Sequence, residues 1–191
     1  MDLNVIFFIG PQGSGKGTQA KILAKKLDFF YWEMGGMLRG MKDENTDLAR
    51  KVTDMINQGI LLPDDILLEV VKQKLDEIPA GKGVIFDGIP RRIGQAKFLM
   101  DYLKGQGRKD FTTLYISLPR EESMKRLLLR AQKEGRVDDT PEKIEFRLQQ
   151  YEKDTIPVLE YFRKETNFIE INGQPPIEEV AKSINEALGL A

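Results

Sequence analysis

The 191-residue chain contains no cysteine and no histidine. The missing cysteines exclude disulfide bonds, thiol catalysis and cysteine-ligated metals. The missing histidines remove the commonest general base at neutral pH and the commonest zinc ligand. A reaction catalysed by this chain must therefore depend on carboxylates, or on positioning and stabilisation by charged groups.

Long apolar runs and an excess of one charge are also missing. No segment reaches the roughly 20 apolar residues of a membrane-spanning helix, and the N-terminus lacks the basic start and cleavage site of a signal peptide. The chain has 29 Lys and Arg against 30 Asp and Glu, a formal net charge of −1. A basic field for nucleic acid is thus absent. We expect a cytoplasmic protein that binds neither nucleic acid nor membranes.

Short apolar segments alternate with amphipathic helical patterns along the chain. We expect strands at residues 5–9, 29–32, 84–87, 111–118 and 168–171. This alternation predicts a single α/β domain over residues 1–191, with a doubly wound, parallel, five-stranded sheet flanked by helices. Between residues 32 and 84 we expect two helices and no strand, the second capped by Asp64 or Asp65. A later helix begins at Thr140 and Pro141 and is expected to kink or break at Pro157.

The motif Gly10-Pro11-Gln12-Gly13-Ser14-Gly15-Lys16-Gly17-Thr18 lies between the first apolar run and a helical pattern. Strand, glycine-rich turn and helix in this order are typical of a phosphate-binding P-loop. Glycines let backbone amides turn inward around an anion, and the helix directs its positive end to the same point. Lys16 adds a charge for the outer phosphates. Gly17 stands where the general signature has Ser or Thr, so a metal ion would be held mostly through water and phosphate.

Arginines next to breaks in secondary structure indicate an acceptor that also carries phosphate. The planar guanidinium donates paired hydrogen bonds and keeps its charge. The candidates are Arg39, Arg91, Arg126, Arg130, Arg136 and Arg147. We expect Arg50, Arg92 and Arg108 to be ordinary solvated surface residues.

Several of these motifs together resemble the adenylate kinase family of nucleoside monophosphate kinases. The similar segments are the loop at 10–18, Asp87-Gly88-Ile89-Pro90-Arg91, Gln95, Arg126 with Arg130, Gly135-Arg136-Val137-Asp138-Asp139, and Arg147-Leu148. The likeness runs from the first strand to the last helix. It implies reversible transfer of a phosphoryl group, ATP plus AMP giving two ADP, with Mg²⁺.

The resemblance also implies roles for individual residues. The catalytic charges would be Lys16, Arg91, Arg126, Arg136 and Arg147. ATP would be bound by Gly13, Ser14, Gly15, Lys16, Gly17, Thr18, Arg126 and Arg130, and by the backbone carbonyl of Pro175. Asp87 would hold Mg²⁺ through water. A short lid at 131–140 would close over the phosphates; it has neither the length nor the ligands for zinc.

On the acceptor side, the resemblance implies an AMP-binding segment at residues 33–62. Arg39 would bind the AMP phosphate, and Gln95 would bond the edge of the adenine. The other AMP contacts would be Met34, Ile60, Leu61, Leu62, Gly88, Ile89, Pro90, Arg91, Arg136 and Arg147. Met34 replaces a usual threonine and Gly36 a usual aspartate, so adenine selectivity loses a side-chain hydrogen bond at Met34.

Other functions remain open from the sequence. A UMP/CMP kinase or a nucleoside monophosphate kinase of broad specificity fits Met34, although Gln95 argues against a pyrimidine acceptor. A P-loop ATPase or switch needs a residue that positions water, and no clear candidate is found. Retention of Lys16 and the arginines argues against a non-catalytic nucleotide-binding module. We expect a monomer.

Overall fold

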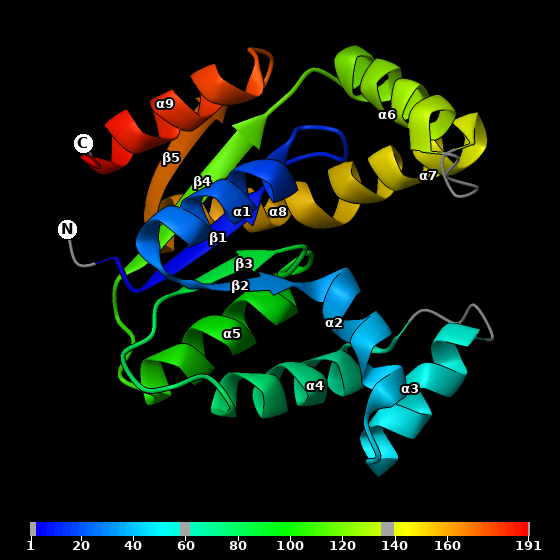
Figure 1. The fold of residues 1–191 in the computed structure, drawn as a ribbon, viewed down its shortest axis with the longest axis vertical. Coiled ribbons are helices and arrows are strands. Elements are labelled where there is room, and N and C mark those ends of the chain that lie inside the picture. Colours follow the sequence, from blue (N-terminus) through cyan, green and yellow to red (C-terminus); the bar gives the residue numbers. More distant parts are fainter. Residues whose placement is uncertain (1–2, 58–61, 135–139, 191) are drawn as a thin grey trace.

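The computed structural model describes residues 3–57, 62–134 and 140–190. Five parallel strands form one sheet in the order β2-β3-β1-β4-β5 (Figure 1). They are β1 Val5–Ile9, β2 Phe30–Glu33, β3 Val84–Asp87, β4 Phe111–Ser117 and β5 Asn167–Asn172. The predicted doubly wound five-stranded sheet is confirmed. Strand β2 runs to Glu33, one residue further than expected, and this residue pairs in register with Asp87.

The central strand β1 is buried on both faces of the sheet. Val5, Phe7 and Ile9 belong to one core cluster, whereas Ile6 and Phe8 belong to the other. Helices α4 Asp64–Asp76, α5 Ile93–Gly105 and α8 Ile156–Glu165 contribute to the first cluster. Helices α1 Lys16–Leu27 and α9 Ile177–Leu188 contribute to the second. Cover on both faces explains why the strand is an unbroken apolar run.

Two helical segments lie beside the carboxyl ends of the strands. One follows β2 and consists of α2 Met34–Gly40, the 3₁₀ turn η1 Met41–Asp43, and α3 Asp47–Asn57. The other follows β4 and consists of α6 Arg120–Glu134 and α7 Pro141–Gln150. In Figure 1 both lie on the right, the side to which the strand arrows point, while both chain termini lie on the left. No helix within the described ranges is long and apolar enough to cross a membrane.

The helix starts differ in part from prediction. Thr140 caps α7 as expected, since its hydroxyl accepts a hydrogen bond from the amide of Lys143 with Pro141 at the first position. The predicted cap of α4 is wrong. Pro63 occupies the cap position without a side-chain bond, and Asp64 already belongs to the first helical turn. The Asp64 carboxylate instead accepts hydrogen bonds from Arg92 and Gln95.

Helices α7 and α8 are joined by a π-helical turn, η2 Tyr151–Thr155. The predicted kink at Pro157 is therefore placed a few residues too late. Pro157 lies in the first turn of α8, where a missing amide hydrogen is tolerated. Within the π turn, the hydroxyl of Thr155 donates a hydrogen bond of 3.2 Å to the carbonyl of Arg91. The irregular turn thus touches the segment that follows β3.

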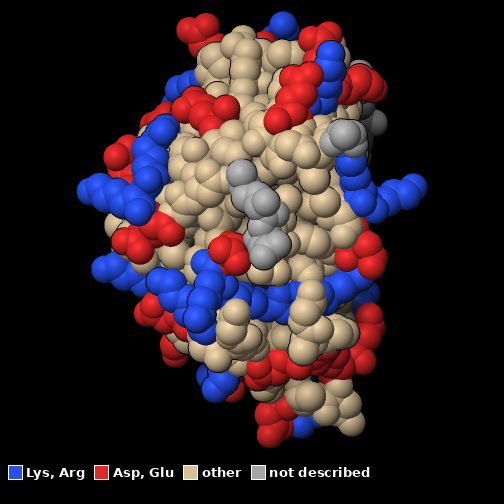
Figure 2. Space-filling view, turned by 90° about the vertical axis from the view of Figure 1, so that its left-hand side faces the viewer, with Lys and Arg blue, Asp and Glu red and all other residues tan. Residues whose placement is uncertain are grey.

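The face on the left of Figure 1 carries both chain ends and is shown in Figure 2. Lys and Arg side chains are interspersed there with Asp and Glu around a largely uncharged centre. Neither sign of charge dominates this face.

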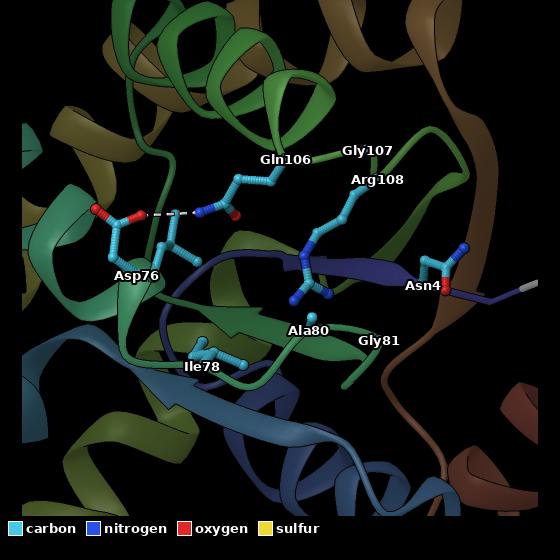
Figure 3. Close-up of a pocket in the computed structure, with 9 residues that line it drawn as sticks. Asn4, Asp76, Ile78, Ala80, Gly81, Gln106, Gly107 and Arg108 are labelled. Atoms are coloured by element: carbon cyan, nitrogen blue, oxygen red, sulfur yellow. Dashed lines mark hydrogen bonds between the residues drawn. The ribbon is translucent and has the colours of Figure 1, made fainter.

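Arg108 corrects another expectation. Its side chain is only 9% exposed, in a recess of about 400 Å³ between the loops after α4 and α5 (Figure 3). The guanidinium donates a hydrogen bond to the carbonyl of Lys82, which joins these two loops. Desolvation by burial lowers the pKa of Arg108. Arg50 and Arg92 are at least half exposed, as predicted.

Replacing Phe7 by alanine should strongly destabilise the protein. Its ring stacks on Phe86, Phe111 and Phe162, with centroid distances of 5.2, 6.2 and 4.9 Å. A buried Phe→Ala change costs about 3–5 kcal/mol of unfolding free energy. The measurement is urea denaturation followed by circular dichroism. Phe146→Ala is the control, because Phe146 is 57% exposed. Equal losses in the two variants would contradict the proposed core.

Candidate active site

The loop between β1 and α1 is shaped by close backbone packing. Gly13 and Gly15 both have φ of +84°, which side chains rarely allow. A β-carbon at Gly10 would lie 2.5 Å from the carbonyl oxygen of Ile116 in β4. Gly15 is the N-cap residue of α1 and makes no side-chain cap bond. The first amides of α1 therefore point to the loop without a side-chain partner, as an anion-binding helix start requires.

Polar atoms buried in this loop support a ligand-binding role. Among the described residues, Oγ of Ser14 and Oε1 of Gln12 are buried without a hydrogen-bond partner. Buried polar groups are usually satisfied by protein, water or ligand. Thr18 is exposed in the first turn of α1. The expected phosphate-binding residues 13–18 thus form one continuous loop and helix start.

Lys16 lies at the centre of a cluster of charges. Its ammonium group is 3.4 Å from the carbonyl oxygen of Pro11. Desolvation lowers the pKa of Lys16, the negative charge of Asp87 opposes this, and the positive charges of Arg91 and Arg130 add to it. The structure therefore brings together side chains from three segments that lie far apart in the sequence: Lys16, Asp87 with Arg91, and Arg130. A recess of about 60 Å³ lies here, lined by the loop, the turn at 88–91 and the π turn.

Asp87 ends strand β3 and is 8% exposed. The hydroxyl of Tyr31 donates a hydrogen bond of 2.9 Å to Oδ2 of Asp87. Burial and the charge of Asp87 raise the pKa of Tyr31, which keeps the phenol a hydrogen-bond donor. Sequence reasoning missed Tyr31, because nothing in an aromatic strand marks one ring as the partner of a distant carboxylate.

Gly17, the unusual glycine after the lysine, lies against the carboxylate of Asp87. A β-carbon at Gly17 would lie 2.9 Å from Oδ2 of Asp87 and 3.8 Å from the hydroxyl of Tyr31. A serine or threonine there would push against this hydrogen-bonded pair. The glycine thus leaves the space in which the carboxylate lies.

The turn after β3 is held from several sides. Gly88 has φ of +87°, and the Ile89–Pro90 peptide bond is cis. Nε of the Arg91 guanidinium donates a hydrogen bond of 2.9 Å to the carbonyl of Gly88. The backbone amide of Arg91 donates a hydrogen bond of 2.8 Å to Oε1 of Gln95. Desolvation lowers the pKa of Arg91, opposed by the charge of Asp87 and reinforced by that of Arg147. Arg91 is therefore fixed at the carboxyl edge of the sheet, beside Asp87.

Gln95 is only 4% exposed, and both ends of its amide are engaged. Oε1 accepts from the amide of Arg91, and Nε2 donates 2.8 Å to Oδ1 of Asp64. Each end keeps one further position, a second N–H on Nε2 and a second lone pair on Oε1, so a contact with an adenine edge depends on access to this buried side chain. In this structure the side chain orients the backbone of Arg91.

The arginines of α6 and α7 take different positions. Arg126 donates three hydrogen bonds: one of 3.0 Å to the carboxylate of Glu122, one of 2.9 Å to the carbonyl of Gly173 and one of 2.8 Å to the carbonyl of Gln174. It thereby links α6 to the loop that carries the half-buried Pro175. The charge of Arg130 acts on Lys16, and that of Arg147 acts on Arg91. Arg136 lies outside the described residues.

On the predicted acceptor side, Met34 is 5% exposed and belongs to the core cluster that includes Phe7. Leu62 is half-buried and packs against the same cluster, whereas Ile60 and Leu61 lie outside the described residues. Arg39 is paired with Glu33, with 3.2 Å between Nη2 and Oε1. The sequence analysis did not single out Glu33, although a carboxylate at the carboxyl end of a strand could have been noticed.

Asp87 is a suitable ligand for a hard cation held through water. Its hydrogen bond from Tyr31 uses Oδ2. No group of three acidic side chains in the described ranges is arranged to hold a metal ion.

The glycine-rich loop between β1 and α1, with Lys16 and Asp87 at the strand ends, defines a P-loop nucleotide-binding protein. Comparison with known proteins gives the family. The sequence model of adenylate kinase matches residues 8–167. Proteins named adenylate kinase from Parabacteroides distasonis and Phenylobacterium zucineum are 39% and 36% identical over 186 residues, which is 97% of each chain compared. Another, from a Cyanothece species, is 36% identical over 94% of this chain and 92% of its own. The chain belongs to the adenylate kinase family.

Replacing Gly17 by alanine should displace the Asp87 carboxylate from Tyr31. The added methyl group occupies space 2.9 Å from Oδ2, so the phenol–carboxylate bond lengthens or breaks. Losing one hydrogen bond to a charged group costs about 1.5–3 kcal/mol of unfolding free energy. Urea denaturation measures the loss, and a crystal structure of the variant shows the carboxylate position.

Gly105→Ala is the matched control for this substitution. Gly105 ends α5, and a β-carbon there meets no atom within 4 Å. Alanine in a helix is favoured over glycine by up to about 1 kcal/mol, so this variant should be neutral or slightly more stable. A Gly17→Ala protein as stable as Gly105→Ala, with the Tyr31 bond intact, would refute the steric explanation.

Proposed function

We propose that this chain is an adenylate kinase, which transfers the terminal phosphoryl group of ATP to AMP in a reversible, magnesium-dependent reaction. The observation that carries the proposal is the convergence of Lys16, Asp87 and Arg91 at the P-loop. Membership of the adenylate kinase family supports the choice of substrates.

The donor triphosphate would lie in the loop at 13–18. The free amides at the start of α1 bind phosphate oxygens, and Lys16 reaches the outer phosphates. Arg130 adds positive charge near Lys16. Arg126 holds the backbone at 173–174, so the Pro175 carbonyl could accept a hydrogen bond from the donor base. As a catalytic charge, Arg126 would use the two N–H groups that its three hydrogen bonds leave over.

Magnesium, when bound with ATP, would neutralise charge on the outer phosphates and orient them. Asp87 would hold a metal-bound water with Oδ1, while Tyr31 keeps the carboxylate in place through Oδ2. Gly17 supplies no side-chain ligand, which leaves this position to water.

In the transfer, the bond from the γ-phosphorus to the β–γ bridging oxygen breaks, and a bond to an AMP phosphate oxygen forms. The attacking oxygen is already ionised at neutral pH, since the second phosphate pKa is about 6. No general base is therefore needed, which fits a chain without histidine. Lys16, Arg91, Arg147 and Arg136 would stabilise the charge on the transferring group.

The acceptor would bind against the segment 33–62, with its phosphate on Arg39 and Arg91. Residues Gly88, Ile89 and Pro90 would shape one wall, and the backbone at 60–62 another. Met34 is buried, so its contribution to a base contact would be a small apolar surface. The segment 131–140 would close as a lid and exclude water, which prevents loss of the phosphoryl group by hydrolysis.

A nucleoside monophosphate kinase of broader specificity, or one that prefers UMP or CMP, is the second candidate. Met34 and Gly36 supply no side-chain hydrogen bond to an acceptor base. Gln95 retains one N–H and one oxygen lone pair beyond its two protein hydrogen bonds, but the residue is only 4% exposed.

The test of the proposed function is a panel of acceptors with ATP and Mg²⁺. AMP should give the highest kcat/KM among AMP, CMP, UMP and GMP, with nucleoside diphosphates as products. A coupled assay for the nucleoside diphosphate products and a separate assay for inorganic phosphate distinguish phosphoryl transfer from hydrolysis. A preference for CMP or UMP would favour the second candidate, and phosphate release faster than diphosphate formation would indicate a hydrolase.

Arg91→Ala should lower kcat about 10³-fold or more while the protein stays folded, as loss of an arginine that stabilises transferring phosphate does elsewhere. Coupled kinetics and urea denaturation together separate catalysis from folding. Arg163→Ala is the control, because Arg163 pairs with Glu170 on the outer edge of the sheet. A folded Arg91→Ala enzyme with near-normal kcat would remove Arg91 from the catalytic residues.

A further inference from the structure

The segment from Glu33 to Arg39 forms a small charged cradle. Glu33 is the last residue of β2, and Arg39 lies in the last turn of α2. Oε1 of Glu33 is 3.2 Å from Nη2 of Arg39, so the arginine folds back along its own helix toward the strand. Glu33 pairs in register with Asp87, which puts the cradle at the carboxyl edge of the sheet.

The two glycines of α2 leave the space that this ion pair occupies. A β-carbon at Gly36 would lie 2.9 Å from Oε2 of Glu33. A β-carbon at Gly35 would lie 3.0 Å from Nη1 of Arg39 and 3.5 Å from Oε1 of Glu33. The carboxylate and the guanidinium therefore lie over bare helix backbone, in positions that side chains at 35 and 36 would disturb.

The pair is too exposed to contribute much to stability. The side chain of Arg39 is 70% exposed and that of Glu33 41% exposed. Solvent screening and side-chain entropy leave such pairs with little net effect on folding. The glycines also weaken a short helix. The ion pair therefore contributes little to the free energy of folding.

We propose that Glu33 is a positioning residue for the acceptor phosphate, which holds Arg39 in its binding orientation before the acceptor arrives. This inference rests on the proposed function, because Arg39 is the side chain proposed to bind that phosphate. A free arginine side chain loses much rotamer freedom when it binds an anion. The bond to Glu33 already restricts the rotamers of Arg39 in the free protein. Less conformational entropy is then lost when the acceptor binds, which strengthens binding.

The geometry of the pair lets Arg39 serve both anions. The hydrogen bond to Glu33 uses Nη2 alone among the nitrogens of the guanidinium. The planar guanidinium presents two edges with paired N–H donors, Nε with Nη2 and Nη1 with Nη2, and Nη2 contributes a different N–H to each. Glu33 accepts one of these Nη2 hydrogens, so the edge that carries the other stays open to a phosphate. The single hydrogen bond to Glu33 is therefore compatible with phosphate binding.

Glu33→Ala should weaken AMP binding about three- to tenfold, the range expected for releasing one long side chain. Isothermal titration with AMP measures this directly, and coupled kinetics should show a raised KM for AMP with kcat and KM for ATP within about twofold. The melting temperature should change by less than about 2 °C. Unchanged AMP affinity, or tighter binding from relief of competition, would overturn the proposal.

Glu170→Ala is the matched control. Glu170 pairs with Arg163 at the same 3.2 Å, with side chains 48% and 44% exposed, on β5 and α8. This variant should leave AMP affinity unchanged. A loss equal to that of Glu33→Ala would show a general charge effect and reject a specific role for Glu33.

Moving the carboxylate from position 33 to position 36 gives a further test. A damaged structure could lower AMP affinity, but it could not restore it. Gly36→Asp alone should weaken AMP binding, because its β-carbon would meet Glu33 and two carboxylates would lie together. Glu33→Ser opens that space, so the double variant Glu33→Ser/Gly36→Asp should regain most of the affinity lost in either single variant. A double variant whose loss of AMP binding free energy equals the sum of the two single losses would contradict positioning by a carboxylate.

The effect should also require Arg39. In an Arg39→Ala background, Glu33→Ala should cause no further loss of AMP affinity, whereas independent contributions would add. The wild-type acceptor panel decides the proposed function first. Efficient diphosphate formation by the wild type, with unaltered AMP affinity in Glu33→Ala, would reject this inference alone.

Discussion

The charged site depends on how closely the backbone packs around the P-loop. Gly10 lies against β4, and Gly17 lies against the carboxylate of Asp87. Gly173, in the loop after β5, has the carbonyls of Ser117 and Ser14 within 3.0 Å of where a β-carbon would be. These contacts bring the ends of β1, β3, β4 and β5 together at one point. Larger side chains would separate the loop from the residues that surround it.

Close packing there also concentrates positive charge. Lys16 and Arg91 both have pKa values lowered first by desolvation and then by neighbouring arginines, with Asp87 as the opposing carboxylate. Such a cluster is unfavourable without an anion and strongly favourable with one. The protein keeps it because the parallel sheet and its two core clusters supply the stability that the site does not.

Much of the fold and the P-loop could be predicted from the sequence, because both depend on local patterns. The apolar run at 5–9 and the glycines that follow it specify strand, turn and helix within a few residues. The partners of Gln95, Arg126 and Asp87 could not be predicted in this way. They come from segments about 30 to 56 residues away, and only the folded sheet brings them together.

The errors have the same origin. Arg108 resembles a surface arginine in sequence, but two loops at the amino edge of the sheet enclose it. Asp64 has the residue type of a helix cap, yet its carboxylate is engaged by Arg92 and Gln95. In both cases a tertiary contact outweighed a local preference. Family resemblance suggested roles for these regions but not the hydrogen bonds by which this chain builds them.

The π turn at Tyr151–Thr155 has a consequence for the recess beside Lys16. A π turn takes up one extra residue inside a single widened turn of helix. That widened turn carries Tyr151 and Thr155, which line the recess, and the hydroxyl of Thr155 bonds the carbonyl of Arg91. A one-residue deletion there would therefore alter the wall of the recess, even though Lys16, Asp87 and Arg91 are all unchanged.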